Sequence, residues 1–111
     1  MRQVRHPLVR QDVLGIFEHV IATTGGDLDA AERRLDEIDD LLAAIAANPA
    51  SGVRLGGALS GWLVRHGGRQ RMLTIVFRPD LDRSLVYIAL IAFGGRNWLE
   101  AAEGRRDFPD L

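Results

Sequence analysis

The sequence contains no cysteine and no lysine, and these two absences exclude several kinds of chemistry. Without thiolates, a disulfide framework, a cysteine-ligated zinc site and a cysteine nucleophile are all ruled out. Without lysine, Schiff-base chemistry is ruled out as well, and all fourteen basic residues are arginine. We attribute this bias chiefly to GC-rich coding, because alanine and glycine are abundant too.

Long hydrophobic runs are also missing. No stretch approaches the roughly 18 consecutive apolar residues of a transmembrane helix, and the first residues lack the apolar core of a signal peptide. We therefore expect a soluble, cytoplasmic protein that makes no contact with a membrane. The histidines His6, His19 and His66 fall in three separate predicted elements without ligand-like spacing, so we expect no metal site and no cofactor.

The net charge of −1 conceals an uneven distribution along the chain. Residues 1–47 carry five arginines against nine acidic residues, whereas residues 51–98 carry seven arginines against two acidic residues. This asymmetry predicts an acidic helical half and a basic half that meets a partner. The length of 111 residues is enough for one core, which we assign to residues 1–98. We expect residues 99–111 to form a tail that is either a short helix or flexible.

The first half of the chain predicts a strand and two helices. Residues 2–6 are typical of a short strand. Apolar residues recur at helical spacing over residues 9–21 and again, more clearly, over residues 28–45. Pro49 bars continuation of the second helix. The short connection between the helices predicts an antiparallel hairpin.

Local signals around the second helix are specific enough to test. Asp27 or Asp29 can cap its first turn, and Arg33 is spaced to form a surface pair with Glu37. Residues 50–61 are rich in glycine and predict a mobile loop without secondary structure.

Three strand-like runs follow, over residues 62–66, 71–78 and 85–93. Gly67-Gly68 predicts a tight hairpin between the first two runs, and residues 79–82 predict the next turn. Alternation in the second run predicts one strongly apolar face, while the third run is apolar throughout and predicts a strand covered on both faces. The expected fold is α+β in the order β-α-α-β-β-β, with an antiparallel sheet and an α-helical hairpin on one face.

Arginines cluster at the ends of these predicted strands. In such a meander Arg65, Arg71 and Arg96 approach one end of the sheet, with His66 and Trp98 nearby. Such a group could bind an anion beside a stacking ring, whereas the plainer interpretation is solvated arginines and a tryptophan that packs. The candidate target-binding residues are Arg65, Arg69, Arg71, Arg78, Arg96 and Trp98.

Three segments together resemble a known family. They are AANPASGVRL at residues 46–55, GWLVRHGGRQRMLTIVFR at 61–78 and VYIALIAFGGRNW at 86–98. In this order and spacing they are similar to the RelE/ParE superfamily of toxins from bacterial type II toxin-antitoxin systems. RelE-like members cut mRNA on the ribosome, and ParE-like members inhibit DNA gyrase. Arg71 and Arg96 match arginines of the family pattern.

The resemblance favours the ParE branch, because the proton-transfer groups of a nuclease are scarce. Arg65 stands where the nuclease branch commonly has lysine, and no tyrosine or histidine follows Arg96. RNA cleavage requires a base and an acid, and arginine, with its very high pKa, is a poor proton shuttle. The alternatives are a non-toxic member that only binds its antitoxin and a RelE-like mRNA endonuclease that uses Arg65, His66, Arg71 and Arg96.

The resemblance also implies a partner. It implies a cognate antitoxin, of ParD-like type with a ribbon-helix-helix DNA-binding domain, in a heterotetramer or larger complex. The antitoxin would lay helices against the helical hairpin and cross the basic sheet with an acidic extended segment. The implied antitoxin-binding residues are Val13, Phe17 and Leu42.

Overall fold

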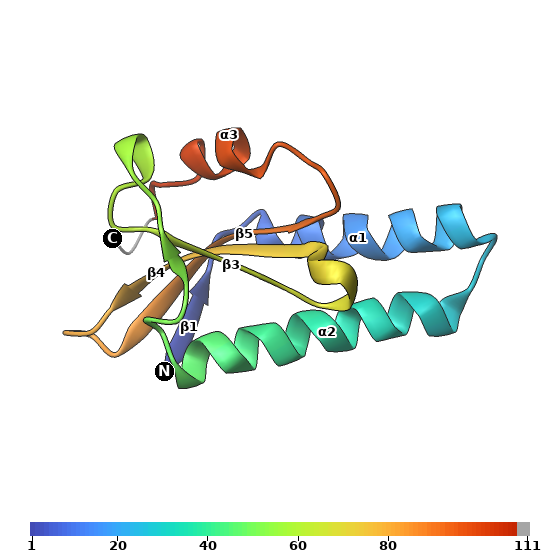
Figure 1. The fold of residues 1–111 in the computed structure, drawn as a ribbon, viewed down its shortest axis with the longest axis horizontal. Coiled ribbons are helices and arrows are strands. Elements are labelled where there is room, and N and C mark those ends of the chain that lie inside the picture. The colour runs from blue at the N-terminus through green and yellow to red at the C-terminus, as the bar shows by residue number, and fades with distance from the viewer. Residues whose placement is uncertain (109–111) are drawn as a thin grey trace.

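The computed structural model describes residues 1–108, and these form a five-stranded sheet between a helical hairpin and a short third helix (Figure 1). The expected α+β class and the order β-α-α-β-β-β are confirmed, with one short strand and one short helix added. The strands are β1 (Arg2–Arg5), β2 (Val53–Arg54), β3 (Leu63–Gly67), β4 (Leu73–Asp80) and β5 (Leu85–Phe93). The helices are α1 (Val9–Thr24), α2 (Leu28–Ala47) and α3 (Trp98–Glu103), with single 3₁₀ turns η1 (Gly57–Leu59) and η2 (Arg69–Arg71).

The sheet has the order β1-β5-β4-β3-β2 and is mixed. The strands β3, β4 and β5 pair antiparallel, as predicted, and the unpredicted strand β2 pairs antiparallel with β3. The expected all-antiparallel sheet is wrong at its other edge, because β1 joins β5 in parallel, with Arg2 opposite Leu85 and Arg5 opposite Ile88. A hairpin forces antiparallel pairing, whereas β1 and β5 are joined by most of the chain, so their direction was not determined locally.

The two long helices begin and end where the sequence signals lie. The Asp27 carboxylate accepts a hydrogen bond of 3.0 Å from the backbone N–H of Ala30, which identifies Asp27 as the cap of α2. The predicted surface pair is wrong by one position. Glu37 binds Arg34 at 2.9 Å, three residues away, and the Arg34 side chain is largely buried, whereas Arg33 is exposed. Within the described residues, no helix is long and apolar enough to cross a membrane.

Each face of the sheet supports its own core. The helix-side core joins α1 and α2 to one face of the sheet through residues such as Val9, Ile16, Ile38, Leu42, Leu73, Phe77 and Ile88. The outer core covers the opposite face through Leu59, Trp62, Val64, Val76, Tyr87, Leu90, Ala102 and Phe108. The strand β4 is therefore buried on both faces, not on one as its alternation predicted, because η1, α3 and Phe108 close the second face.

The connection between β3 and β4 is longer than the predicted glycine hairpin. After Gly68 the chain makes the 3₁₀ turn η2, in which Gln70 and Arg71 adopt positive φ values of 55° and 56°. The strand β4 consequently begins at Leu73 and not at Arg71. The Gly67-Gly68 signal correctly indicated a turn here but could not give the number of residues in it.

The predicted turn at residues 79–82 also begins too early. Pro79 and Asp80 still pair with Val86 and Leu85 of β5, so the turn starts at Leu81. Proline is tolerated there because β3 pairs with β4 only as far as Phe77, and the edge of β4 that would need the missing N–H is unpaired.

The segment 50–61, predicted to be a loop, contains β2 and η1. The strand β2 extends the sheet with two residue pairs, Val53 opposite Val64 and Arg54 opposite Leu63. Gly52 passes so close to β3 that an added Cβ would lie 2.9 Å from the Cβ of Leu63. This close approach brings the segment over the sheet and leads the chain to η1 above the outer core.

A polar network joins three parts of the chain beside a bulge in β5. Val76 lies opposite Leu90 and Phe77 opposite Ile88, so Ala89 is the extra residue. The pairing with β1 ends here, where the N–H of His6 donates to the carbonyl of Ile88 at 2.8 Å. Beyond this point, two side chains bind the outer edge of β5.

Those side chains are Asp12 of α1 and Arg105, which follows α3. The Asp12 carboxylate accepts from the N–H of Ile91 at 3.1 Å, and the Arg105 guanidinium donates to the carbonyl of Ala89 at 3.2 Å. The two side chains also bind each other through two hydrogen bonds of 2.5 and 2.9 Å. We call this group the edge clamp, because it joins α1, the edge of β5 and the C-terminal segment.

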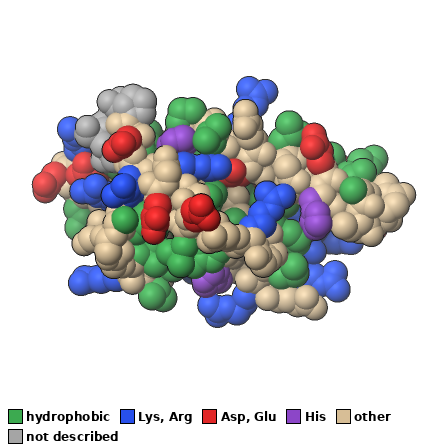
Figure 2. Space-filling model, turned by 90° about the horizontal axis from the view of Figure 1, so that it is seen from above, with side chains coloured by type: hydrophobic (Ala, Val, Ile, Leu, Met, Phe, Trp, Pro, Cys, Tyr) green, Lys and Arg blue, Asp and Glu red, His purple; other side chains and the backbone are tan. Residues whose placement is uncertain are grey.

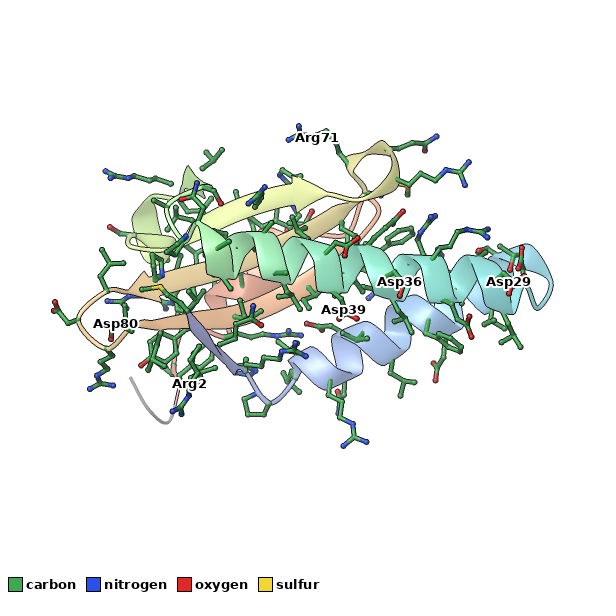
Figure 3. All side chains as sticks on the ribbon, turned by 90° about the horizontal axis from the view of Figure 1, so that it is seen from below. Arg2, Asp29, Asp36, Asp39, Arg71 and Asp80 are labelled. Atoms are coloured by element: carbon green, nitrogen blue, oxygen red, sulfur yellow. The ribbon has the colours of Figure 1, made fainter. Side chains whose placement is uncertain are left out.

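We predict that Asp12→Ala destabilises the protein by about 3–5 kcal/mol, because it leaves a largely buried guanidinium and a strand N–H without their acceptor. Urea unfolding followed by circular dichroism measures the change. The control is Asp36→Ala on the exposed side of α2 (Figure 3), which should change stability by less than about 0.5 kcal/mol. Similar losses in the two variants would contradict the clamp.

Candidate functional site

One end of the sheet gathers three of the predicted target-binding arginines. Arg69 and Arg71 lie in the β3–β4 connection, and Arg96 lies in the β5–α3 connection. The two connections are joined by a 2.9 Å hydrogen bond from the N–H of Gly94 to the carbonyl of Met72. All three arginines are exposed. We call this end the arginine end of the sheet.

Arg78 does not belong to the arginine end. It lies opposite Tyr87, near the other end of β4, and lines a shallow hollow with Asp80 and Asp82. Figure 3 shows Arg71 and Asp80 at opposite ends of the sheet. Acidic neighbours and distance therefore separate Arg78 from the other candidates.

Arg65 and His66 are adjacent in sequence but face opposite sides of β3. Arg65 lies opposite Ile75 of the helix-side core, and its guanidinium donates to the Ser51 hydroxyl at 2.7 Å. His66 lies opposite Thr74, with its Nδ1 2.9 Å from the Thr74 hydroxyl. The four residues of the nuclease alternative are therefore not brought around one point, since the sheet separates Arg65 from His66.

The Trp98 side chain packs against the protein and is not fully exposed to solvent. It is the first residue of α3, is half-buried and is packed against the outer core. Its ring meets that of His66 edge to face, with centroids 5.9 Å apart. This is the packing role that the sequence left open beside the stacking role.

An apolar groove runs along α1 beside Leu35 of α2 and the end of β1. It encloses about 560 Å³ and is lined by Arg5, His6, Pro7, Arg10, Val13, Leu14, Phe17 and Leu35. Leu14 is 55% exposed, and Arg5 and Arg10 are exposed on the same lining. Of the three implied antitoxin-binding residues, Val13 and Phe17 line this groove. Leu42 is only 3% exposed and belongs to the helix-side core.

His6 lies between this groove and the edge clamp. Its Nδ1 accepts a 3.1 Å hydrogen bond from the N–H of Leu8, and its ring meets the Phe108 ring edge to face at 5.3 Å. Burial lowers the pKa of His6 below the ordinary value of 6.5, the charge of Arg105 lowers it further, and Asp12 opposes the shift. Sequence reasoning missed this group, because no spacing links residue 6 with residue 105.

A second hollow lies at the arginine end, on the side of α1. It encloses about 500 Å³ and is lined by Ile16, His19, Met72, Phe93, Gly94, Gly95 and Arg96. The His19 and Phe93 rings are 6.1 Å apart. We call this hollow the sheet-end pocket. Sequence reasoning also missed His19 here, since only helix packing brings α1 to the end of β5.

Charge is less segregated in space than along the chain. Asp29, Asp36 and Asp39 lie along α2 in Figure 3, so the acidic character expected of the helices is found there. On the face covered by α3, however, basic side chains are dispersed among acidic and hydrophobic ones (Figure 2). Among the described residues, no three histidine, aspartate or glutamate side chains form a group that could hold a metal ion.

Comparison with known proteins adds no family assignment. No protein-family model matches the chain, and a comparison with curated proteins found no match.

We predict that Gly68→Ala destabilises the turn that carries Arg69 and Arg71, at a cost of about 1–3 kcal/mol. Gly68 has a φ of 71°, and an added Cβ would lie 2.9 Å from Leu73 Cδ1 and 3.0 Å from Glu37 Oε2. Thermal unfolding measures the effect. Gly95→Ala is the matched control, because an added Cβ there meets no atom within 4 Å. The prediction fails if both variants melt together with the wild type.

We predict that neutral His6 stabilises the fold above pH 6.5 and that this contribution is lost as the pH falls from 6.5 through its lowered folded pKa. In that window the unfolded chain binds more protons than the folded chain, so acidification favours unfolding. NMR titration of His6 and urea unfolding at pH 8 and pH 5 provide the measurements. His6→Asn retains an acceptor but does not titrate, and should weaken the pH dependence.

Proposed function

We propose that this protein is the toxin of a type II toxin-antitoxin system, of the RelE/ParE superfamily and closer to its ParE branch. In this proposal it arrests bacterial growth by inhibiting DNA gyrase, and a cognate antitoxin neutralises it in the cytoplasm. Its support begins with the fold, in which a helical hairpin packs on one face of a β-meander in the order that the family resemblance implies.

The observation that carries the choice of branch is the separation of Arg65 from His66 by the sheet. An in-line RNA cleavage needs a proton-transfer group beside the cations that stabilise the phosphorane. Here His66 is turned toward Thr74 and Trp98 on the outer face, while Arg65 binds Ser51. This arrangement supports a toxin that binds its target over one that cleaves mRNA.

The apolar groove supports the antitoxin. A row of half-buried and exposed apolar side chains on α1, bordered by Arg5 and Arg10, is suited to the apolar face of an amphipathic helix with acidic flanks. This is the chemistry that the resemblance implies for the antitoxin segment beside Val13 and Phe17.

We predict that induction of the chain alone in bacteria arrests growth and reduces negative supercoiling of a reporter plasmid, while messages stay intact. Growth curves, chloroquine gels and mapping of mRNA ends give the three readouts. Codon-phased mRNA cleavage with unchanged supercoiling would move the protein to the RelE-like alternative. Normal growth at full expression would instead support the alternative of a non-toxic member that only binds its antitoxin.

We predict that Leu14→Asp prevents neutralisation by the protein encoded beside this gene but preserves growth arrest. Burial of a leucine side chain contributes about 1.5–3 kcal/mol, and the substitution removes this contribution. It also adds a negative charge that repels the acidic flanks of the antitoxin helix. Leu81→Asp, at a site 70% exposed in the β4–β5 turn, is the matched control and should be neutralised normally. Normal rescue of the Leu14 variant would exclude the groove as the antitoxin site.

A further inference from the structure

The sheet-end pocket combines an apolar floor with a cationic mouth. Its apolar side chains, which we call the floor, are Ile16, which is buried, Phe93, which is half-buried, and Met72, which is 36% exposed. A volume of about 500 Å³ lies within the range of small-molecule sites. The apolar floor therefore suits a flat apolar group such as a heterocyclic base, and the pocket is large enough to hold one.

The part of the lining formed by Gly94, Gly95 and Arg96, which we call the mouth, is suited to an anion. Arg96 is exposed on its lining, and none of the described residues that line it is acidic. Gly94 and Gly95 place backbone there without side chains, and an added Cβ at Gly95 meets no atom within 4 Å. A phosphate group could thus approach both the guanidinium fork and the backbone.

The surroundings favour a phosphate over a carboxylate. Arg69 and Arg71 lie in the adjoining connection, held beside the pocket by the bond between Gly94 and Met72. Three exposed arginines at one end suit a group that carries more than one negative charge. His19 of α1 also lines the pocket, and its ring nitrogens can form a hydrogen bond with the edge of a base.

We propose that the sheet-end pocket binds a 5′-nucleotide unit, with its base on Phe93 and Met72 and its phosphate at Arg96. Stacking of bases on aromatic side chains and binding of phosphates by arginine are the two contributions that such sites combine. This inference goes beyond the proposed function, since it concerns a ligand of the purified chain and not the antitoxin or gyrase. The nucleotide is either free or part of a single strand.

Titration of the full chain with adenosine 5′-monophosphate, followed by NMR chemical shifts, tests the proposal. Shifts should concentrate at Ile16, Met72, Gly94 and Gly95. Adenosine alone and inorganic phosphate alone should each bind at least tenfold more weakly. Equal binding of either fragment, equal binding of N-acetyl-phenylalanine as a carboxylate probe, or shifts spread over the whole surface would overturn it.

Matched variants separate the pocket from general electrostatics. Arg96→Ala should weaken binding at least tenfold, whereas Arg54→Ala, at the far edge of the sheet, should not. Gly95→Asp should abolish binding by placing a carboxylate in the mouth, while the equally open Gly56→Asp should bind normally. Equal losses in the paired variants would refute the site.

A second titration identifies the source of the nucleotide. A 5′-phosphorylated tetradeoxyadenylate that binds tighter than the mononucleotide, with shifts extending to Arg69 and Arg71, indicates a single strand. Equal affinities indicate a free nucleotide. Nucleotide binding is measured on purified protein, so absence of binding would not contradict the growth and supercoiling results. Absence of growth arrest would likewise not contradict nucleotide binding.

Discussion

The edge clamp is the interaction on which the arrangement of the whole chain depends. Asp12 and Arg105 are 93 positions apart, yet they meet at the edge of β5 beyond the point where its pairing with β1 ends, beside the bulge. A buried ion pair contributes little net stability if its geometry is poor, but here each charge also binds backbone of β5. The clamp thus holds both α1 and the C-terminal segment, which returns over the sheet, against the edge of β5.

That return determines which surfaces are available for function. Residues 98–108 close the outer core, with Ala102 and Phe108 buried, so the second face of the sheet is interior and not a broad basic platform. The last three residues of the predicted tail, 109–111, lie outside the described residues. What stays accessible is the rim: the arginine end, the sheet-end pocket and the groove along α1.

Some candidate site residues could be predicted from the sequence and others could not, depending on how far apart in the chain their neighbours lie. Arg69, Arg71 and Arg96 could be grouped from the sequence, because a meander with short turns brings alternate strand ends together. Arg65 was expected at the same end, but it lies opposite Ile75 on the helix-side face, and the candidate Arg78 lies near the other end of β4. Both positions depend on register. His6 and His19 were missed, because their neighbours come from helix packing and from the clamp.

By itself, the sequence determined the α+β class, the two helices with their stops, the β5 strand and the absence of thiol and lysine chemistry. These follow from local periodicity, capping and composition, which act over a few residues. Only the tertiary structure decided the parallel pairing of β1, the burial of the second face of β4, the separation of Arg65 from His66 and the composition of the two hollows. Those features depend on contacts between segments far apart in the chain. There, backbone groups must form hydrogen bonds while apolar side chains are buried, and no local sequence pattern identifies the segment that will be the partner.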